Sequence, residues 1–390
     1  MPTNFIFNNG GNNADFSDVF IPVSAFAQGQ LWIWGNNTNS ELGDGTFTGK
    51  KSSPVQTISG GINWKQVDCG SFASAAIKTD GALWLWGSRS YGNMGNNNGF
   101  AGFQFSPVQT ISGGTNWKQV SCGYYSTAAI KTDGTLWTWG NNIIGQCGDN
   151  TNVDKSSPVQ TVASGANWKQ VSVGNVHDGA IKTNGTLWLW GRGDTGGLGD
   201  NTIVNKSSPV QTISGGTNWK QVSCGENDST AAIKTDGTLW LWGKNTAGQL
   251  GDNTIVNKSS PIQTISGGTN WKQVSCGDES TAAIKTDGTL WLWGINNAGQ
   301  LGDNTRTNVS SPIQTISGGT NWSQVSTGGL QSSSIKTDGT LWTWGFNTNG
   351  NLGDNTINFR SSPVQTAAGG TNWKQTSSNT FGMAAVQNNF

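Results

Sequence analysis

Short apolar runs with a period of two recur along the chain, and one complete unit extends from Thr269 to Thr315. Two alternating or apolar runs are followed by an Asp-Gly pair, which between residues of strand character is the strongest short-range signal of a β-hairpin. Two further runs complete the unit. The pattern predicts four short antiparallel strands in about 51 residues, the size of one β-propeller blade. The four runs lie at 271–276, at 282–284, at 290–293 and from Pro312 onward, and the turn is Asp287-Gly288.

The third run indicates how each sheet is covered. Successive side chains of a strand point to opposite faces, and in Leu290-Trp-Leu-Trp293 both faces are large and apolar. Both therefore need cover, which a propeller provides because each sheet lies between two others. Asn-Trp and Leu-Trp-x-Trp-Gly, about twenty residues apart in a unit, each occur seven times, with a period of 51 to 53 residues, and together they account for all 21 Trp. A fixed period of this length predicts repeated units, here seven in one ring.

The two ends of the sequence each carry half a unit. The N-terminal part contains Gln30–Trp34 and Pro54–Thr57 without an Asn-Trp strand before them, and the C-terminal part contains Asn372–Gln375 and Ala384–Val386. These halves are complementary, so we expect them to pair into a composite seventh blade that closes the ring and leaves no open sheet edge. The predicted organisation is an N-terminal arm at 1–21 that docks on a partner or on the ring, and an all-β seven-bladed propeller of four-stranded antiparallel blades at 22–390. Its blades are expected at about 62–110, 115–161, 166–212, 217–264, 269–315, 320–366, and 371–390 plus 22–58.

Charge limits the classes of partner. Basic and acidic residues balance at 22 each, and only 11% of the chain is charged. Nucleic-acid binding needs a basic stripe, and an electrostatic membrane anchor needs a basic cluster, so we expect neither nucleic acid nor membrane insertion. No apolar run approaches the ~18 residues of a spanning helix, and the N-terminus does not resemble a signal peptide. The expected location is a virion surface if the protein is phage-encoded, and otherwise the cytoplasm.

Cysteine and histidine give no metal or cofactor site. Four of the five Cys occupy equivalent positions in different units, where other units have Val173, Thr327 or Ser378. A position that accepts these four residue types is a small packing site rather than a ligand site. The spacings match no zinc pattern, and there is a single His. The recurring Gly-Asp-Asn-Thr offers one carboxylate per loop, too few for Ca²⁺, and predicts a turn in which Asp bonds its own backbone. We expect no cofactor, no metal and no catalysis.

Strand direction alternates within a blade, so the loops after the first and third strands emerge on one face. The opposite face is nearly uniform, because Lys-Thr-Asp-Gly recurs there, whereas the first face differs in every unit. Aromatic residues and Arg are enriched at binding surfaces, and loops carry function, so this varied face is the predicted binding face. The alternative is that these residues are ordinary exposed loop tips. The candidate residues are Phe72, Arg89, Tyr91, Phe103, Tyr124, Tyr125, His177, Asp178, Arg192, Glu226, Asp228, Asp278, Glu279, Leu330 and Phe346.

A family resemblance supports the predicted fold. The unit carries Cys276-Gly277, Ala283-Ile284, Asp287-Gly288, Trp293-Gly294, Asn296, Gly299-Gln-Leu-Gly302 and Pro312. With these residues it resembles the regulator of chromosome condensation repeat family, whose members form seven-bladed propellers, over roughly residues 24 to 390. The family includes an exchange factor with a charged working face and a light receptor with Gly-Trp-Arg-His-Thr loops. This neutral chain lacks those loop segments. The regular Trp-rich units look most like bacterial and phage-encoded members, and one secreted bacterial member simply binds and inhibits an enzyme.

These observations predict a non-enzymatic binding or structural module, as an outer component of a phage virion (tail or head) or as a surface-adhesion protein. The alternative is an intracellular bacterial protein-interaction scaffold. An enzyme is a third interpretation and would need acids converging at the mouth of the central channel. The expected ligand is a protein or a surface glycan, and residues 1–21 are a candidate contact for other virion proteins, since the segment at 4–10 is similar to the openings of marine-phage structural proteins.

Overall fold

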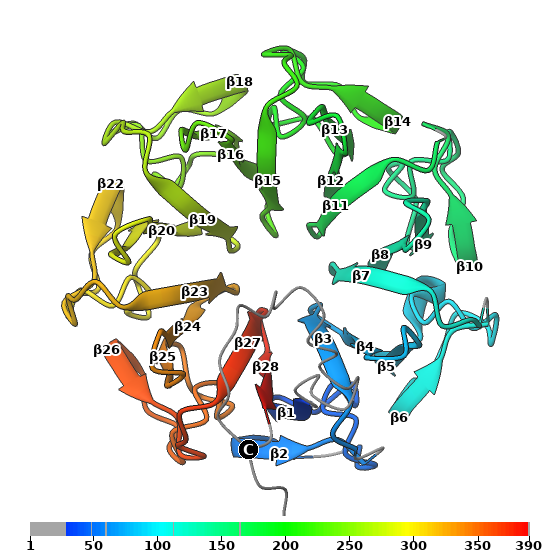
Figure 1. Ribbon diagram of the computed structural model, residues 1–390, viewed down its shortest axis with the longest axis horizontal. Helices are drawn as coiled ribbons and strands as arrows, with labels where there is room; N and C mark the ends of the chain where they lie inside the picture. The colour runs from blue at the N-terminus through cyan, green and yellow to red at the C-terminus, as the bar shows by residue number, and fades with distance from the viewer. Residues whose placement is uncertain (1–28, 48, 59–60, 112, 164, 389–390) are drawn as a thin grey trace, which may run out of the picture.

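Seven antiparallel sheets surround a central axis in the computed structural model, which describes residues 29–47, 49–58, 61–111, 113–163 and 165–388 (Figure 1). The predicted seven-bladed propeller is confirmed. Five blades are separate four-stranded sheets, and the remaining eight described strands form blades I and VII, which share one bridge between Gly29 and Trp64. The predicted arm at 1–21 lies outside the described residues.

Blades I to VI each use four strands in chain order from the axis outward, and blade VII combines the two ends of the chain. Blade I is β3 (Trp64–Cys69), β4 (Ala73–Lys78), β5 (Leu83–Ser88) and β6 (Phe103–Gln109), with the 3-10 turn η3 (Ser90–Gly92) before β6; blade II is β7 (Trp117–Cys122), β8 (Ser126–Lys131), β9 (Leu136–Gly140) and β10 (Lys155–Gln160); blade III is β11 (Trp168–Val173), β12 (His177–Lys182), β13 (Leu187–Gly191) and β14 (Lys206–Gln211). Blade IV is β15 (Trp219–Cys224), β16 (Ser229–Lys234), β17 (Leu239–Gly243) and β18 (Lys258–Gln263); blade V is β19 (Trp271–Cys276), β20 (Ser280–Lys285), β21 (Leu290–Gly294) and β22 (Val309–Gln314). Blade VI is β23 (Trp322–Thr327), β24 (Gln331–Lys336), β25 (Leu341–Gly345) and β26 (Arg360–Gln365); blade VII is β27 (Trp373–Ser378), β28 (Gly382–Asn388), β1 (Gly29–Gly35) and β2 (Lys51–Gln56).

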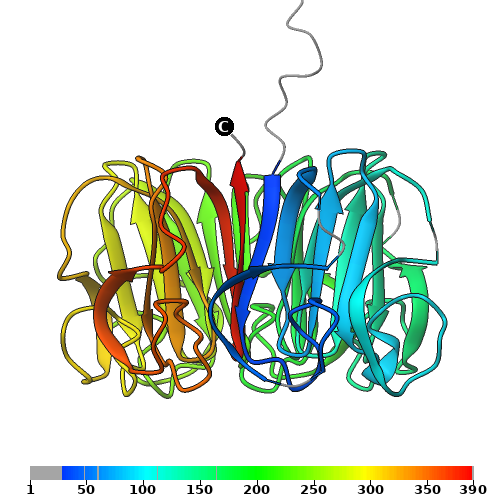
Figure 2. The same ribbon diagram turned by 90° about the horizontal axis from the view of Figure 1, so that it is seen from below.

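The alternation of strand direction gives the disc two different faces (Figure 2). The loops after the first and third strands of each blade lie on one side, which we call the loop face. The Asp-Gly turns and the links between blades lie on the other side, the turn face, where β28 ends and β1 begins. The first strands are nearest the axis, so the loops that follow them surround one mouth of the central channel (Figure 1).

Tryptophan fills the space between neighbouring blades, as the two-faced apolar strand predicts. Trp293 of blade V is fully buried against blade IV and donates its indole N–H to the carbonyl of Gln249 at 2.8 Å. The equivalent Trp of every other blade makes the same bond to the blade before it, at 2.7 to 2.8 Å. Each such Trp also packs on a glycine: a Cβ at Gly251 would lie 2.8 Å from Trp293 Nε1, so only glycine fits there. Burial of one such side chain contributes about 1.5–3 kcal/mol, and the bond satisfies its polar edge.

A second set of contacts joins the innermost strands around the axis. Gln221 Nε2 donates to the carbonyl of Val274 at 2.9 Å, and its Oε1 accepts from the N–H of Val274 at 3.1 Å. Every blade has a glutamine at this position that bonds the next blade in the same way. Two residues further along each strand, a Ser hydroxyl, or the carboxylate of Asp68 in blade I, accepts from a backbone N–H of the next blade. Side chains therefore satisfy the inner strand edges that face the channel.

The ring closes within blade VII, as the half-units at the two ends predict. β1 pairs with β28 over seven residue pairs, from Gly29 with Asn388 to Gly35 with Gly382. The rings of Trp32 and Trp373 meet edge to face with centroids 6.4 Å apart. Because β1 and β28 pair with each other, neither strand is left as an exposed sheet edge.

The cysteine positions are buried and reduced. All five cysteines are free thiols with little exposure, and at the four equivalent positions they pack against the preceding blade. Burial raises the pKa of the Cys69 thiol to about 12. The described part of the chain contains no helix with the length and apolar character needed to span a bilayer.

Candidate functional site

Five aromatic side chains from three blades meet on the loop face beside the channel mouth. The Phe72 ring lies 4.7 Å from the ring of Tyr124 and 4.9 Å from that of Tyr125, between centroids. Tyr91 contacts Tyr125 at 4.8 Å, and Phe381 contacts Phe72 at 5.4 Å. Tyr91 is 38% exposed and Tyr124 is 37% exposed. We call these five residues the aromatic cluster; it brings together four predicted site residues and adds Phe381.

Local structure keeps part of the aromatic cluster at the surface. Tyr91 lies in η3 with φ 58° and ψ 13°, a left-handed conformation that is unfavourable for a large side chain. Gly92 follows it with its α-carbon packed so closely on Ser156 of the next blade that a Cβ would lie 2.5 Å from the Ser156 Cα. Backbone strain of this kind persists where the surroundings impose it, and it clusters at binding sites. Burial and the neighbouring phenols raise the pKa of Tyr125, so its side chain is neutral at pH 7.

Acidic side chains from blades IV and V occupy the other side of the mouth. Glu226 reaches from the loop after β15 to blade VII, where its carboxylate accepts from the hydroxyl of Thr380, and it also accepts from Asn175 Nδ2 at 3.4 Å. Burial, and to a smaller extent the nearby carboxylate of Asp278, raise the pKa of Glu226 to about 7. Thr380 precedes Phe381 of the aromatic cluster, so the carboxylate and the rings belong to one surface.

The loop after β19 carries the other two predicted acids. Burial, and then the charge of Glu279, raise the pKa of half-buried Asp278. Glu279 forms an ion pair with Lys244 Nζ at 2.7 Å and accepts from Asn227 at 3.5 Å. Asp278 and Glu226 have no ion-pair partner among the residues that the structure describes.

Below these loops the channel contains a cavity of about 120 Å³. Its described lining is mostly polar and includes Glu226, Asp68 and the six serines that are equivalent to Asp68 in the other blades, namely Ser121, Ser172, Ser223, Ser275, Ser326 and Ser377. Burial raises the pKa of Asp68, although its carboxylate accepts from the N–H of Cys122 and the hydroxyl of Ser377, both at 2.8 Å. No Lys or Arg is among the described lining residues.

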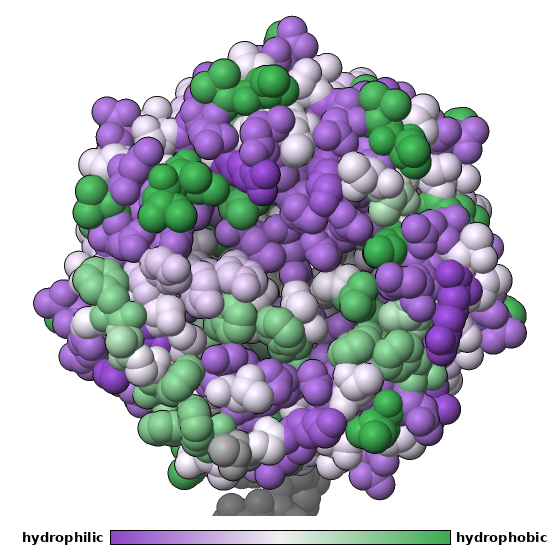
Figure 3. All heavy atoms as spheres, turned by 180° about the vertical axis from the view of Figure 1, so that it is seen from behind, coloured by the Kyte–Doolittle hydropathy of each residue, from purple (hydrophilic) through white to green (hydrophobic). Residues whose placement is uncertain are grey.

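Five further predicted residues belong neither to the aromatic cluster nor to the acidic group at the mouth. Phe103 packs on Phe47 at 5.1 Å, and Phe346 packs on Phe359 at 5.0 Å. Arg192 forms an ion pair with Asp194 at 2.7 Å. Arg89 and Leu330 are half-buried, and the backbone N–H of Arg89 donates to Gly102 at 2.9 Å. Apolar residues form several separate patches around this face, with polar surface between them (Figure 3).

Three predicted residues are not on the surface. His177, Asp178 and Asp228 are 0%, 1% and 1% exposed, so the prediction that they contact a partner on the binding face is wrong for these side chains. His177 is the first residue of β12, as Ser229 is the first residue of the equivalent strand β16 in the next blade. The His177 side chain enters the interior and bonds the Thr230 hydroxyl at 2.8 Å. Burial lowers the pKa of His177 to about 3 and raises that of Asp228 to about 6, and 3.5 Å separates His177 Nδ1 from Asp228 Oδ1. The ring is neutral at pH 7, so this pair is a buried polar contact.

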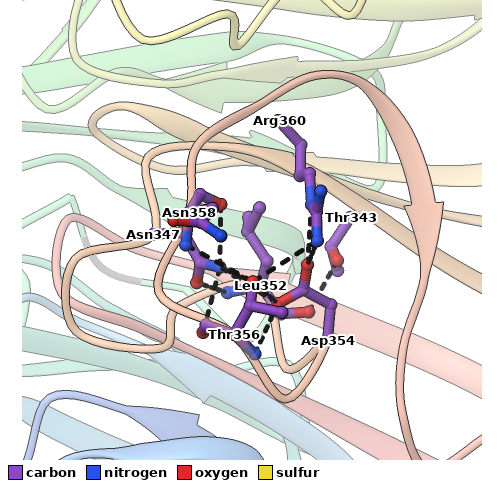
Figure 4. Close-up of polar contacts among 7 residues, drawn as sticks. All are labelled: Thr343, Asn347, Leu352, Asp354, Thr356, Asn358 and Arg360. Carbon is purple, nitrogen blue, oxygen red and sulfur yellow. Dashed lines mark hydrogen bonds and ion pairs between the residues drawn. The ribbon is translucent and has the colours of Figure 1, made fainter.

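The repeated Gly-Asp-Asn-Thr loops are structural, as the sequence predicts for an Asp that bonds its own turn. In blade VI the Asp354 carboxylate accepts from the Thr356 N–H at 3.0 Å, from Asn347 Nδ2 at 3.0 Å and from Arg360 Nε at 2.8 Å (Figure 4). Asn347 Oδ1 also accepts from the Leu352 N–H at 2.9 Å. Both oxygens of the Asp354 carboxylate therefore accept hydrogen bonds from nearby residues, and these bonds fix the loop. Nowhere in the described ranges do three His, Cys, Asp or Glu side chains come together in a way that could hold a metal ion.

Sequence reasoning missed two parts of the site. Phe47 contacts Phe103 and Phe105 at the periphery, and the Thr380 hydroxyl donates to the Glu226 carboxylate across the channel. An internal comparison of the repeats would have placed His177 correctly, because it aligns with buried Ser126, Ser229 and Ser280 at the start of each second strand. No comparable signal exists for Thr380 and Glu226, which are 154 residues apart.

The fold and the repeated motif define a seven-bladed β-propeller with one composite blade. Residues 114–386 match the RCC1-like domain, and residues 28–77 and 80–130 match the regulator of chromosome condensation (RCC1) repeat. The chain belongs to this family.

Its relatives have different roles. The chain is 29% identical over 325 residues to the ultraviolet-B receptor UVR8 of Arabidopsis thaliana, which covers 82% of this chain and 73% of that protein. It is 27% identical over 361 residues to the human E3 ubiquitin-protein ligase HERC2, a match that covers 88% of this chain and only 7% of that protein.

Solved structures show the same fold. Human WBSCR16 superposes with a TM-score of 0.81 at 19% identity and covers 93% of this chain and 99% of that chain. Yeast RCC1 (Prp20), solved with Kap60, superposes with a TM-score of 0.81 at 16% identity and covers 100% of this chain and 97% of that chain.

Proposed function

We propose that this protein is a non-enzymatic binding module whose loop face binds another protein. The observation that carries the proposal is the aromatic cluster. Exposed Tyr and Phe rings supply large contact area at low entropic cost, and such residues dominate the energetics of protein interfaces. Their contacts with one another hold the rings in place before a partner arrives, which lowers the cost of binding. A binding role agrees with a solved structure of the family, since yeast RCC1 was solved in complex with Kap60.

The rest of the loop side supports binding over catalysis. Its buried His177 has no access to a substrate, and the Asp of the repeated loops is held in turns. An enzyme would need acids that converge on a substrate, but of the acids at the mouth only Glu226 is among the described lining residues of the cavity. The cavity has a volume of about 120 Å³, which is small beside the ~300–1,000 Å³ of ligand pockets. A protein surface that contacts the mouth from outside fits this geometry better than an enclosed small substrate.

The setting that we propose is the outside of a particle or cell, as an outer virion component or a surface-adhesion protein that binds a protein or a glycan. The low share of charged residues and the Asn-, Gly- and Thr-rich loops support it. The alternative is an intracellular protein-interaction scaffold, which the five free thiols favour because cysteines stay reduced in the cytosol. Immunogold electron microscopy of the native source distinguishes the two settings: label on particles or on the cell surface supports the first, and label inside the cell supports the second.

A three-residue variant tests the binding face itself. We expect Tyr91→Ser, Tyr124→Ser and Phe72→Ser together to abolish capture of the partner from the native source, because they remove the exposed rings and their support. The matched control replaces apolar residues of the turn face, Ile213→Ser and Ile265→Ser, which are also exposed. Undiminished capture by the loop-face variant, with loss in the control, would assign binding to the other face.

A further inference from the structure

Charge is unevenly distributed between the two faces of a chain that is neutral overall. The seven loops around the mouth on the loop face contain three carboxylates that are not buried, Glu226, Asp278 and Glu279, besides the buried Asp228, and they contain neither Lys nor Arg. Basic residues gather toward the turn face: six innermost strands have an exposed Lys as their second residue, and six second strands end in Lys. The mouth loops lie at 70–72, 123–125, 174–176, 225–228, 277–279, 328–330 and 379–381.

The carboxylates at the mouth are incompletely compensated. The hydrogen-bond partners of the Glu226 side chain among the described residues, Thr380 and Asn175, are neutral donors, and both bond the same oxygen, Oε2. Asp278 lies beside Glu279, whose own charge is paired with Lys244. Two like charges that are partly removed from water attract a cation more strongly than exposed acids do.

The aromatic cluster adjoins these acids. Glu226 bonds Thr380, and the next residue, Phe381, contacts Phe72 at 5.4 Å. An aromatic ring has a negative face, so exposed rings and carboxylates favour the same ligand charge. The chain uses this pairing on its turn face, where Lys285 Nζ lies 4.8 Å from the Trp271 ring and 4.6 Å from the Trp291 ring.

We propose that the loop face recognises a basic segment of its protein partner, with a Lys or Arg side chain placed between the exposed rings of Tyr91 and Tyr124 and the carboxylates of Glu226 and Asp278. The proposal rests on the proposed function, because it specifies the chemistry of the partner at the same face. The apolar part of the basic side chain covers the rings, and its charge lies toward the acids. The missing cations around the mouth are then supplied by the partner.

The probe is a synthetic peptide of Arg alternating with Ser, compared with a peptide of the same length in which Gln replaces each Arg. We expect the Arg peptide to bind the full chain, the Gln peptide to bind at least tenfold more weakly, and high salt to weaken binding of the Arg peptide. Glu226→Gln with Asp278→Asn keeps the shape of both side chains and should lower affinity for the Arg peptide about tenfold or more. Tyr91→Ser with Tyr124→Ser should lower it as well.

The matched control makes the same charge change on the other face. Asp236→Asn with Asp287→Asn alters two exposed carboxylates of the turn face and should leave the affinity unchanged. An equal loss in this control, or equal binding of the Gln peptide, overturns the proposal, because attraction would then be general rather than local. Thermal melting of each variant confirms that it is folded. The capture test with the Tyr91, Tyr124 and Phe72 variant separates the two proposals. If the Arg peptide does not bind the native chain but this variant loses the native partner, the proposed basic segment is wrong and the binding face stands. If the Arg peptide does not bind and this variant retains the native partner, the proposed function fails.

Discussion

One glutamine in each blade bonds the backbone of the next blade. The contact that closes the ring, between blades VII and I, can therefore be compared with the same contact between two blades inside the ring, blades III and IV. Gln375 of blade VII bonds the N–H and carbonyl of Val67 in blade I at 3.1 and 2.9 Å. Gln170 of blade III bonds Val222 of blade IV at 3.0 and 2.9 Å. Because the local geometry is the same, Gln375→Ala and Gln170→Ala should destabilise the protein equally.

The expected size follows from the two bonds that are lost. A net contribution of about 0.5–1.5 kcal/mol for each hydrogen bond gives about 1–3 kcal/mol for each substitution. Gln375→Glu retains the acceptor but loses the donor and places a charge beside the Val67 carbonyl, so it should cost at least as much as alanine.

Urea unfolding followed by tryptophan fluorescence measures the effect, because the Trp residues lie between the blades. Gln263→Ala is the control: this glutamine is exposed at the end of β18, and its loss should change stability by less than about 0.5 kcal/mol. The reasoning is refuted if Gln375→Ala and Gln170→Ala shift the urea midpoint no more than the control. A much larger shift for Gln375→Ala alone would show that the composite blade is weaker than the others, contrary to the equal geometry.

Three further predictions concern buried carboxylates and a glycine. Asp68→Ser introduces the residue that the other six blades have at this position. Because burial raises the pKa of Asp68, the contribution of this carboxyl to stability is present below its unfolded pKa and is lost as pH rises. The variant should therefore be more stable than the native chain at pH 7 and lose that advantage in acid. The pKa of Glu226 is raised to about 7, so the free energy of unfolding of the native chain should fall by up to about 3 kcal/mol relative to Glu226→Gln as pH rises from about 4.5 through 7. Melting temperatures of both proteins across this range measure the difference, and a difference independent of pH contradicts the assigned burial. Gly251→Ala should lower the free energy of unfolding in urea by about 1–3 kcal/mol more than Gly267→Ala. Both glycines have positive φ, but only a Cβ at Gly251 would collide with Trp293. Equal losses would mean that the indole moves freely.

Most of the fold could be predicted from the sequence because it depends on local patterns repeated seven times. The Leu-Trp-x-Trp strand is apolar on both faces, which requires sheets on both sides, and the half-units at the two ends require β1 to pair with β28. The role of the Asp in Gly-Asp-Asn-Thr could also be predicted, because its carboxylate accepts from the N–H only two residues further along the chain. The glutamine contacts were not predicted, because a glutamine in a strand does not reveal which backbone it bonds.

The candidate site was predicted less completely, and for a physical reason. The sequence determined which loops share a face, because strand direction alternates in every blade. Only the tertiary structure decided that Phe72, Tyr124 and Tyr125 are in ring contact, that Glu226 reaches Thr380 across the channel, and that Asp228 turns inward with φ 60°. Strand periodicity is set by the nearest residues in the chain, whereas the direction of a loop side chain depends on blades that approach it only after the ring has closed.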